Sequence, residues 1–300
     1  MATAAPVLET AARLSATDIA QYRREGYVVV ERLFDAEELA RVRETIDAMT
    51  AAALRSPDPS QVLELEPEPI DGRRVARRIY EPFHAHEQFR AFATGAKVLD
   101  RIEQLIGPDI MIHHSKLNMK PPRVGSVVEW HQDLAYFPHT NSDLVTTLVY
   151  LDDATEENGC LQVLPREHHR FFDHADREGN FAGMITEDFL SRSNSRPVPL
   201  AAPAGSVIFM HCVLPHASLP NRSAQPRRTM IFEYRAADAL PIWFGPRTAH
   251  FEANVRQLRG KPARFARVSN DPAPLIPQVK QDYKSLYEAQ AAAKAQRAAR

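Results

Sequence analysis

The tripeptide His131-Gln132-Asp133 places an imidazole and a carboxylate one residue apart in the chain. Side chains i and i+2 of an extended strand lie on the same side, so both groups can reach one metal ion. A second imidazole, that of His216, follows a later apolar stretch. Two histidines and one carboxylate form the facial triad expected of non-haem Fe(II) oxygenases, in which other coordination positions stay open.

Ser218 lies two residues after His216, and Arg227 lies eleven residues after it. If a turn at 220–223 joins two paired strands, Arg227 lies beside the segment that carries His216 and Ser218. A guanidinium is the natural partner of the far carboxylate of a 2-oxo acid, and a hydroxyl adds a hydrogen bond. His211 is the alternative second histidine, but we favour His216 because Ser218 and Arg227 follow it. His211 is then interpreted as a buried core residue.

The first part of the chain predicts helices with one strand between them. Ser15 and Asp35 are of the types that cap helix N-termini, and each precedes an apolar periodicity of helical spacing. Gly95 weakens the case for one continuous helix over 89–107. The expected elements are a helix at 16–25, a strand at 27–30, a helix at 36–53, an irregular loop at 56–72, a strand at 74–80 and one or two helices at 89–107.

After residue 109 the apolar pattern changes to short β-like runs separated by turn-rich segments. These runs are 110–119, 125–130, 143–151, 160–164, 206–212 and 227–235. Many short strands after a helical block predict a mainly β protein with flanking helices. Its core is expected to be a β-sandwich or jelly roll.

The pattern predicts one oxygenase domain with short extensions at both ends. The expected parts are a flexible N-terminus at 1–14, the domain at 15–281 and a helical or frayed tail at 282–300. Within the domain we expect a helical part at 15–109, the jelly-roll core at 110–240 and a C-terminal extension at 241–281.

The composition limits the kind of site and the kind of partner. With 12 His and 2 Cys, a metal site must use mainly histidine and carboxylate, and a disulfide framework is excluded. The net charge of −1 argues against a general nucleic-acid binder. No apolar run is long enough to span a membrane, and no secretory signal is visible. We therefore expect a cytoplasmic protein with a small-molecule substrate, no nucleic-acid or membrane partner, and an oligomeric state that the sequence does not reveal.

Four blocks of this sequence resemble the phytanoyl-CoA dioxygenase family of Fe(II)/2-oxoglutarate oxygenases over roughly residues 15–240. They are REGYVVVERLFDAEEL, KLNMKPPRVGSVVEWHQD, DDATEENGCLQVLPREHH and GSVIFMHCVLPHASLPNRSAQPRR. The family includes bacterial ectoine hydroxylase and natural-product hydroxylases. A chance match of all four blocks in this order is improbable.

The resemblance implies a double-stranded β-helix core of the cupin-like kind at 110–240, a cofactor and a set of site residues. It implies Fe(II) held by His131, Asp133 and His216, which are then the metal ligands and the catalytic residues. It also implies 2-oxoglutarate and O2 as co-substrates. The residues expected to contact 2-oxoglutarate are Arg227, Ser218, Asn118 and His114.

Candidate substrate residues follow from charge and aromatic character. Arg77 belongs to a small basic cluster that could capture an anionic substrate group, although a solvated strand edge is the simpler interpretation. Tyr136, Phe137 and Trp243 could line the substrate pocket, although aromatic residues more often pack in a core.

The leading hypothesis is a 2-oxoglutarate-dependent hydroxylase. The resemblance implies oxidative decarboxylation of 2-oxoglutarate to succinate and CO2, coupled to oxidation of an unactivated C–H bond of a small molecule. One alternative is a non-catalytic jelly-roll module that binds metal or acts as a sensor, which would not need Arg227. Another is a hydrolytic His/Asp metal enzyme, for which no candidate general base stands out.

Overall fold

The computed structural model describes residues 13–124, 126–242, 252–269 and 286–298. Its helical N-terminal part begins with α1 (Ala16–Glu25), β1 (Tyr27–Val30) and α2 (Ala36–Leu54). Ser15 and Asp35 cap the two helices as predicted, each in a capping box with the acidic residue three positions on. Gly26 ends α1 in the left-handed conformation and turns the chain directly into β1.

Three shorter helices are formed by residues 82–106. They cover the same face of the large β-sheet as α2. They are α3 (Pro82–Ala85), α4 (Glu87–Thr94) and α5 (Ala96–Ile106). Gly95 adopts an extended backbone and separates α4 from α5, so the expected helical region is two helices. The apolar face of α5 is buried through Val98, Leu99, Ile102 and Ile106.

A large antiparallel sheet forms one wall of the domain. Its strands lie in the order β1-β9-β6-β11-β4-β3-β2, and β12 pairs with β4. The strands not yet given are β2 (Leu63–Leu65), β3 (Ala76–Tyr80), β4 (Ile110–Lys120), β6 (Leu144–Tyr150), β9 (Val207–His211), β11 (Arg227–Ala236) and β12 (Arg256–Arg259). The N-terminal strand β1 joins this sheet by pairing with β9, with Val30 opposite Val207.

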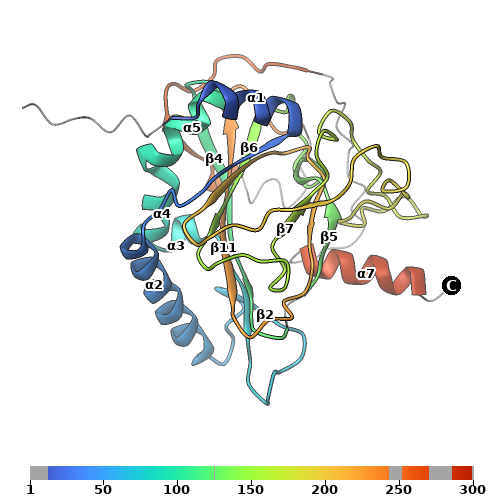
Figure 1. Ribbon diagram of the computed structural model, residues 1–300. Coiled ribbons are helices and arrows are strands. Elements are labelled where there is room, and N and C mark those ends of the chain that lie inside the picture. The colour runs from blue at the N-terminus through green and yellow to red at the C-terminus, as the bar shows by residue number, and fades with distance from the viewer. Residues whose placement is uncertain (1–12, 125, 243–251, 270–285, 299–300) are drawn as a thin grey trace, which may run out of the picture.

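A smaller antiparallel sheet lies across from the large one. It contains β5 (Val128–His131), β10 (His216–Ser218), β7 (Leu161–Val163) and β8 (Val198–Pro199), in the order β5-β10-β7-β8. The short 3-10 helix η2 (Asp133–Ala135) follows β5 after one residue. The two sheets make a sandwich, and Figure 1 shows helices α2, α3 and α4 on the outer side of the large sheet.

Two apolar cores result from this layering. One lies between the large sheet and the helices and includes Ile46, Ile102, Phe209 and Phe232. The other lies between the sheets and includes residues of β6, β7 and β9. Toward β4, β5, β10 and β11 the space between the sheets becomes polar and contains a cavity, so the apolar packing is interrupted where a site can form.

The expected fold class, a mainly β jelly roll with flanking helices, is confirmed. Three short strands, β8, β10 and β12, were not predicted, and β2 lies inside the expected loop 56–72. The pairing considered for the 216–218 segment, with the strand that begins at Arg227, does not form, because β10 pairs with β5 and β7 while β11 pairs with β4 and β6.

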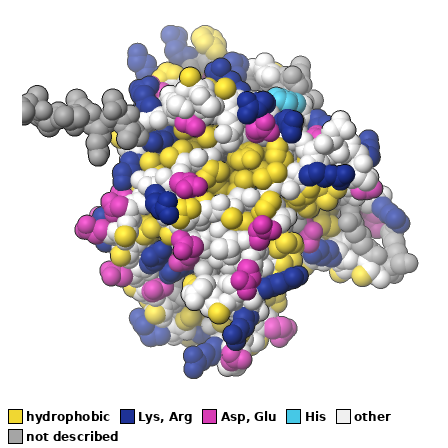
Figure 2. Space-filling model, viewed as in Figure 1, with side chains coloured by type: hydrophobic (Ala, Val, Ile, Leu, Met, Phe, Trp, Pro, Cys, Tyr) yellow, Lys and Arg dark blue, Asp and Glu magenta, His cyan; other side chains and the backbone are white. Residues whose placement is uncertain are grey.

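The tail is a helix, α7 (Leu286–Ala298), which the sequence predicted as helical or frayed. It is not an exposed helix, because Leu286, Tyr287, Ala289 and Gln290 are buried. No helix within the described ranges is long and apolar enough to cross a membrane. Figure 2 shows acidic and basic side chains interspersed on the surface, with apolar side chains gathered in the middle of that face.

Candidate active site

The two histidines of the predicted triad are direct neighbours on paired strands. β5 and β10 run antiparallel, and His131 is the partner of His216 in their register. Side chains of directly opposed residues project from the same face of a sheet. The two imidazole rings therefore lie together, with centroids 4.1 Å apart, on the side of the small sheet that faces the cavity.

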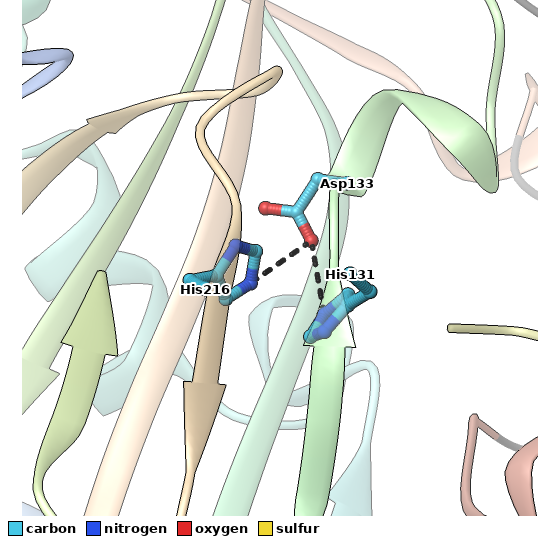
Figure 3. Close-up of side chains that lie close together, drawn as sticks. All are labelled: His131, Asp133 and His216. Carbon is cyan, nitrogen blue, oxygen red and sulfur yellow. Dashed lines mark ion pairs between the residues drawn. The ribbon is translucent and has the colours of Figure 1, made fainter. Parts of the chain in front are cut away.

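Asp133 completes the cluster from the start of η2. Its Oδ1 lies 3.8 Å from Nε2 of His131 and 3.7 Å from Nε2 of His216. One ligand atom from each side chain lies within 4.8 Å of the other two, and all three residues are buried. Figure 3 shows the three side chains converging between the two strands. The spacing leaves room for an ion at their centre.

Backbone carbonyl groups orient both imidazoles. Nδ1 of His131 lies 2.8 Å from the carbonyl oxygen of Glu129, and Nδ1 of His216 lies 3.0 Å from that of Leu214. A carbonyl only accepts, so each Nδ1 carries the hydrogen and each Nε2 keeps its lone pair toward Asp133. Burial, followed by the neighbouring His216, also lowers the pKa of His131 well below its usual range. Neutral imidazoles with free Nε2 atoms are the form that binds a metal.

Gln132 fixes the backbone between the two adjacent ligands. It is fully buried, and its Nε2 donates to the carbonyl oxygens of Arg170 and Val213. Its Oε1 accepts from the backbone N–H of Phe172. The side chain points away from the cavity into the surrounding loops, as expected for the middle residue of an extended tripeptide. Gln132 was noticed in the sequence only as part of the tripeptide, and its role in holding the backbone was not predicted.

The carboxylate of Asp133 has two polar neighbours from the large sheet. Thr146 Oγ1 donates to Asp133 Oδ2 at 2.7 Å, and Lys116 Nζ lies 3.9 Å from Oδ1. Burial raises the pKa of Asp133, but His216, Lys116 and His131 together with the Thr146 hydrogen bond lower it to about 2. Lys116 is itself held by Glu233, with Nζ 2.8 Å from Oε1. Asp133 is therefore an ionised ligand candidate with one fixed orientation.

The cavity extends from this cluster to Arg227 between the two sheets. Its described lining residues are Lys116, Asn118, Lys120, Val128, His131, Asp133, Thr146, Leu148, Leu161, His216, Ala217, Ser218, Arg227, Thr229, Ile231, Leu286 and Tyr287. Arg227 and Ser218 both line it, but from opposite sheets rather than from paired strands. Arg227, Thr229 and Ile231 stand at alternate positions of β11 and share its cavity side.

Arg227 is a buried cation, and not all of its N–H groups donate a hydrogen bond to the described residues. Its Nη1 donates to Thr229 Oγ1 at 2.6 Å, while its Nε is buried and has no partner among the described residues. An unsatisfied buried donor is costly, so it marks a place where a ligand acceptor fits. Asn118 lies nearby in the lining, and its Oδ1 accepts from Arg78 Nε at 3.1 Å. This arrangement leaves the Asn118 amide nitrogen as a donor for a ligand.

Lys120 is a lining residue that was not predicted from the sequence. Its Nζ donates to the carbonyl oxygens of Ser126 and Leu219, both at 2.7 Å. Burial, together with the positive charge of Arg227, lowers the pKa of Lys120 to about 6. The residue ties the loop after β4 to the segment after β10, and so holds the two sheets together at the Arg227 end.

His114, His211 and Phe137 lie outside the lining that the structure describes. His114 pairs through Nδ1 with Glu81 Oε1 at 2.5 Å. Phe137 is buried, with its ring 4.8 Å from that of His113. His211 is only partly buried, beside Tyr22, so the core interpretation holds in part; it is not part of the triad.

The remaining substrate candidates occupy different places. Tyr136 lies edge-on to His131, with ring centroids 5.7 Å apart, and its hydroxyl donates to the Gly183 carbonyl. Arg77 is buried rather than solvated, and its Nη2 lies 2.6 Å from Glu64 Oε1. The solvated strand edge is therefore wrong for Arg77. Trp243 lies outside the described residues.

The donor set fits a catalytic metal site built from histidine and carboxylate. A buried pair of neutral imidazoles and one carboxylate, with open space on one side, is the 2-His-1-carboxylate arrangement of non-haem iron oxygenases. The cluster contains no thiolate, and the cavity beside it leaves space for further ligands of the ion.

Comparison with known proteins confirms the family. The model of the phytanoyl-CoA dioxygenase family matches residues 22–229. The chain is 32% identical over 231 residues to a probable alpha-ketoglutarate-dependent hypophosphite dioxygenase of Stutzerimonas stutzeri, covering 74% of this chain and 79% of that protein. It is 29% identical over 224 residues to a methylphosphonate hydroxylase of Gimesia maris, covering 74% and 81%.

Solved structures agree with the sequence matches. EctD from S. alaskensis with bound Fe has a TM-score of 0.62 and 26% identity, covering 77% of this chain and 80% of that one. The same protein with 2-oxoglutarate and 5-hydroxyectoine has a TM-score of 0.60 over 77% and 79% of the two chains, also at 26% identity. The chain belongs to the phytanoyl-CoA dioxygenase family, and the expectation that it is an enzyme of the dioxygenase class is confirmed.

Proposed function

We propose that this enzyme is an Fe(II)- and 2-oxoglutarate-dependent dioxygenase that oxidises, most simply by hydroxylation, an unactivated C–H bond of a small molecule. The observation that carries the proposal is the buried cluster of His131, Asp133 and His216 at one end of a cavity whose other end holds Arg227. Fe and 2-oxoglutarate are both present in the solved structures of the related EctD. When bound, the iron with dioxygen and 2-oxoglutarate supplies the oxidising chemistry and leaves succinate and CO2.

His131, Asp133 and His216 would hold the iron. The two Nε2 atoms and Asp133 Oδ1 are presented by groups that are already fixed, so little reorganisation is needed on binding. The charges also fit, because two neutral imidazoles and one carboxylate offset only part of a 2+ charge. The remainder favours a dianionic co-substrate in the same cavity.

Arg227, Ser218 and Asn118 would hold the distal carboxylate of 2-oxoglutarate. All three line the cavity, and Arg227 offers its unpartnered Nε there. A planar guanidinium can donate to both oxygens of a carboxylate, which fixes the orientation of the co-substrate as well as its affinity. His114 remains a proposed contact from the family resemblance, although Glu81 is its partner in this structure.

The substrate would approach the metal cluster beside Tyr136, whose ring lies against His131. Arg77 and Phe137 remain candidates for the surroundings of the substrate, with Arg77 held by Glu64 and Phe137 by the core near His113. We further propose that the enzyme acts in the cytoplasm, without nucleic-acid or membrane partners, and that residues 15–281 are one catalytic domain, to which α7 adds Leu286 and Tyr287 at the cavity.

The direct test is formation of succinate from 2-oxoglutarate by the purified protein with Fe(II), dioxygen and a panel of small molecules. The panel begins with hypophosphite and methylphosphonate, because two relatives of this chain are named as a hypophosphite dioxygenase and a methylphosphonate hydroxylase. We expect succinate above the substrate-free background with at least one compound. The proposal is overturned if no succinate forms and anaerobic titration of the Fe(II)-loaded protein detects no 2-oxoglutarate binding.

A further inference from the structure

Helix α7 lies beyond the part of the chain that the family model matches, yet it reaches the cavity. The model match ends at residue 229, whereas α7 spans Leu286–Ala298. Leu286 and Tyr287, at the start of α7, are among the described lining residues. Figure 1 shows α7 on the side of the small sheet, away from the helices that cover the large sheet.

Buried contacts anchor α7 to the strand that carries His131. Gln290 is buried, its Oε1 accepts from the Glu129 backbone N–H at 3.2 Å, and its Nε2 donates to the Gly183 carbonyl at 2.9 Å. Ala289 packs closely against Gly183, because a Cβ added to Gly183 would lie 2.9 Å from the Cβ of Ala289. The carbonyl of the same Glu129 orients His131, so α7 and the triad share one peptide segment.

Tyr287 connects α7 to the polar end of the cavity. Its ring centroid lies 4.2 Å from the guanidinium carbon of Arg77 and 5.1 Å from that of Arg78. Arg78 in turn donates to Asn118, which lines the cavity. Nη1 of Arg78 lies 3.6 Å from Glu64 Oε2, and its Nη2 is buried without a hydrogen-bond partner among the described residues, so the ring supports this side chain together with Glu64 and Asn118. A cation held against an aromatic face away from water is stabilised by the ring quadrupole.

We propose that Tyr287 is a positioning residue of the co-substrate site: its ring holds Arg78 and, through it, Asn118 in place and closes the cavity wall opposite Arg227. The inference rests on the proposed binding of the co-substrate 2-oxoglutarate. It assigns a part of the site to a helix that the family model does not cover. Removal of the ring would loosen the Asn118 donor and admit water to the Arg227 end, without touching the three metal ligands.

The test compares Tyr287→Leu, which keeps apolar bulk but removes the ring, with Tyr287→Phe, which keeps the ring. Co-substrate binding to the Fe(II)-loaded protein is measured anaerobically by calorimetry, and KM and kcat are measured by succinate formation. For Tyr287→Leu we expect both Kd and KM for 2-oxoglutarate to rise about tenfold with kcat and Fe(II) affinity unchanged. Tyr287→Phe should behave like the wild type. A Kd for Tyr287→Leu within about twofold of the wild-type value overturns the inference.

A second pair of variants separates the position of α7 from the chemistry of Tyr287. Ala289→Glu places a charge at a buried position against Gly183, whereas Ala291→Glu makes the same change at an exposed position of the same helix. We expect Ala289→Glu to increase hydrogen exchange across 286–298 and to weaken 2-oxoglutarate binding, and Ala291→Glu to do neither. Detachment of α7 with unchanged 2-oxoglutarate affinity would also overturn the inference. Failure of the wild-type protein to bind 2-oxoglutarate would instead overturn the proposed function.

Discussion

The two ends of the cavity are built by different means. At one end, His131, Asp133 and His216 come from two directly paired segments, and backbone carbonyls orient both rings. At the other end, side chains from both sheets line the cavity: Arg227 donates to Thr229, and Asn118 accepts from Arg78, whose guanidinium lies over the ring of Tyr287 in α7. In the proposed assignment, the metal end is thus fixed by the backbone of one small sheet, and the co-substrate end by contacts between distant side chains.

This difference shows which part of the site tolerates sequence change. A backbone carbonyl is present whatever the residue, so the orientation of both imidazoles survives substitutions at Glu129 and Leu214. The Arg227 end relies on buried charges such as the Arg77–Glu64 pair, with side chains that are each 9% exposed. Removing one partner of a buried pair leaves an uncompensated charge. We infer that the co-substrate end is the more easily altered of the two.

The largest effect is expected from Asp133→Ala, which removes the one charged member of the metal end. Fe(II) binding and succinate formation should both fall below detection, because two neutral imidazoles are a poor site for this ion. Calorimetry with Fe(II) under anaerobic conditions measures the first, and product analysis the second. Asp188→Ala, which removes an exposed carboxylate outside the cavity lining, is the matched control. Unchanged Fe(II) affinity in Asp133→Ala would contradict the assignment.

A smaller effect, confined to the other end, is expected from Arg227→Ala. The KM for 2-oxoglutarate should rise about a hundredfold, since a charge-assisted interaction with a carboxylate is lost in a buried place. Fe(II) affinity should stay the same, which distinguishes this variant from Asp133→Ala. Arg228→Ala removes the neighbouring guanidinium, which points to Asp152 instead, and should leave the KM near the wild-type value. Equal KM changes in both variants would argue against a specific role for Arg227.

Thr146→Val tests whether the metal end also needs a side-chain support. The substitution keeps the shape but removes the hydroxyl that donates to Asp133. Loss of such a support typically weakens metal binding, and we expect about a tenfold lower Fe(II) affinity. With saturating Fe(II), the KM for 2-oxoglutarate should not change. A shift in that KM with unchanged Fe(II) affinity would show that the two ends are coupled rather than independent.

The smallest effect is expected from Lys294→Ala. Lys294 pairs with Glu129 at the surface, and its side chain is 51% exposed. An exposed ion pair contributes at most about 1 kcal/mol, so the free energy of unfolding should change by no more than that. Chemical denaturation measures it, with Gln290→Ala as the comparison at a buried anchor of the same helix. A larger loss for Lys294→Ala than for Gln290→Ala would mean that surface charge, and not burial, holds α7.

The metal end could be predicted from the sequence because its signals are local. The spacing of His131 and Asp133 places them on one side of an extended segment, and Ser218 and Arg227 identified His216 over His211. The sheets were predicted by the same kind of local pattern, since apolar runs such as 143–151 match buried strands closely. The family resemblance predicted Arg227 and Asn118 at the cavity, and both residues line it.

The co-substrate end could be predicted only in part, because its supports come from far along the chain. Arg77 looked like a solvated residue because its partner Glu64 lies in a segment with no strand pattern. Tyr287 is the second residue of α7, an Ala-rich helix whose sequence pattern does not show which face is buried. The pairing of β10 was misjudged because only three residues, His216–Ser218, form the strand, which is too short for a visible period.

The pairing of β1 with β9 has a consequence for how the protein folds. Val30 and Val207 are partners, so this edge of the large sheet cannot form until chain segments far apart in sequence have met. Contacts between residues far apart in sequence require loop closure, and the entropy of the loop is lost before the contacts stabilise the chain. This order slows folding and leaves apolar strands unpaired for longer. We therefore expect refolding on a slow timescale for a chain of this length, with the helices forming first and the sheet edge at β1 closing last.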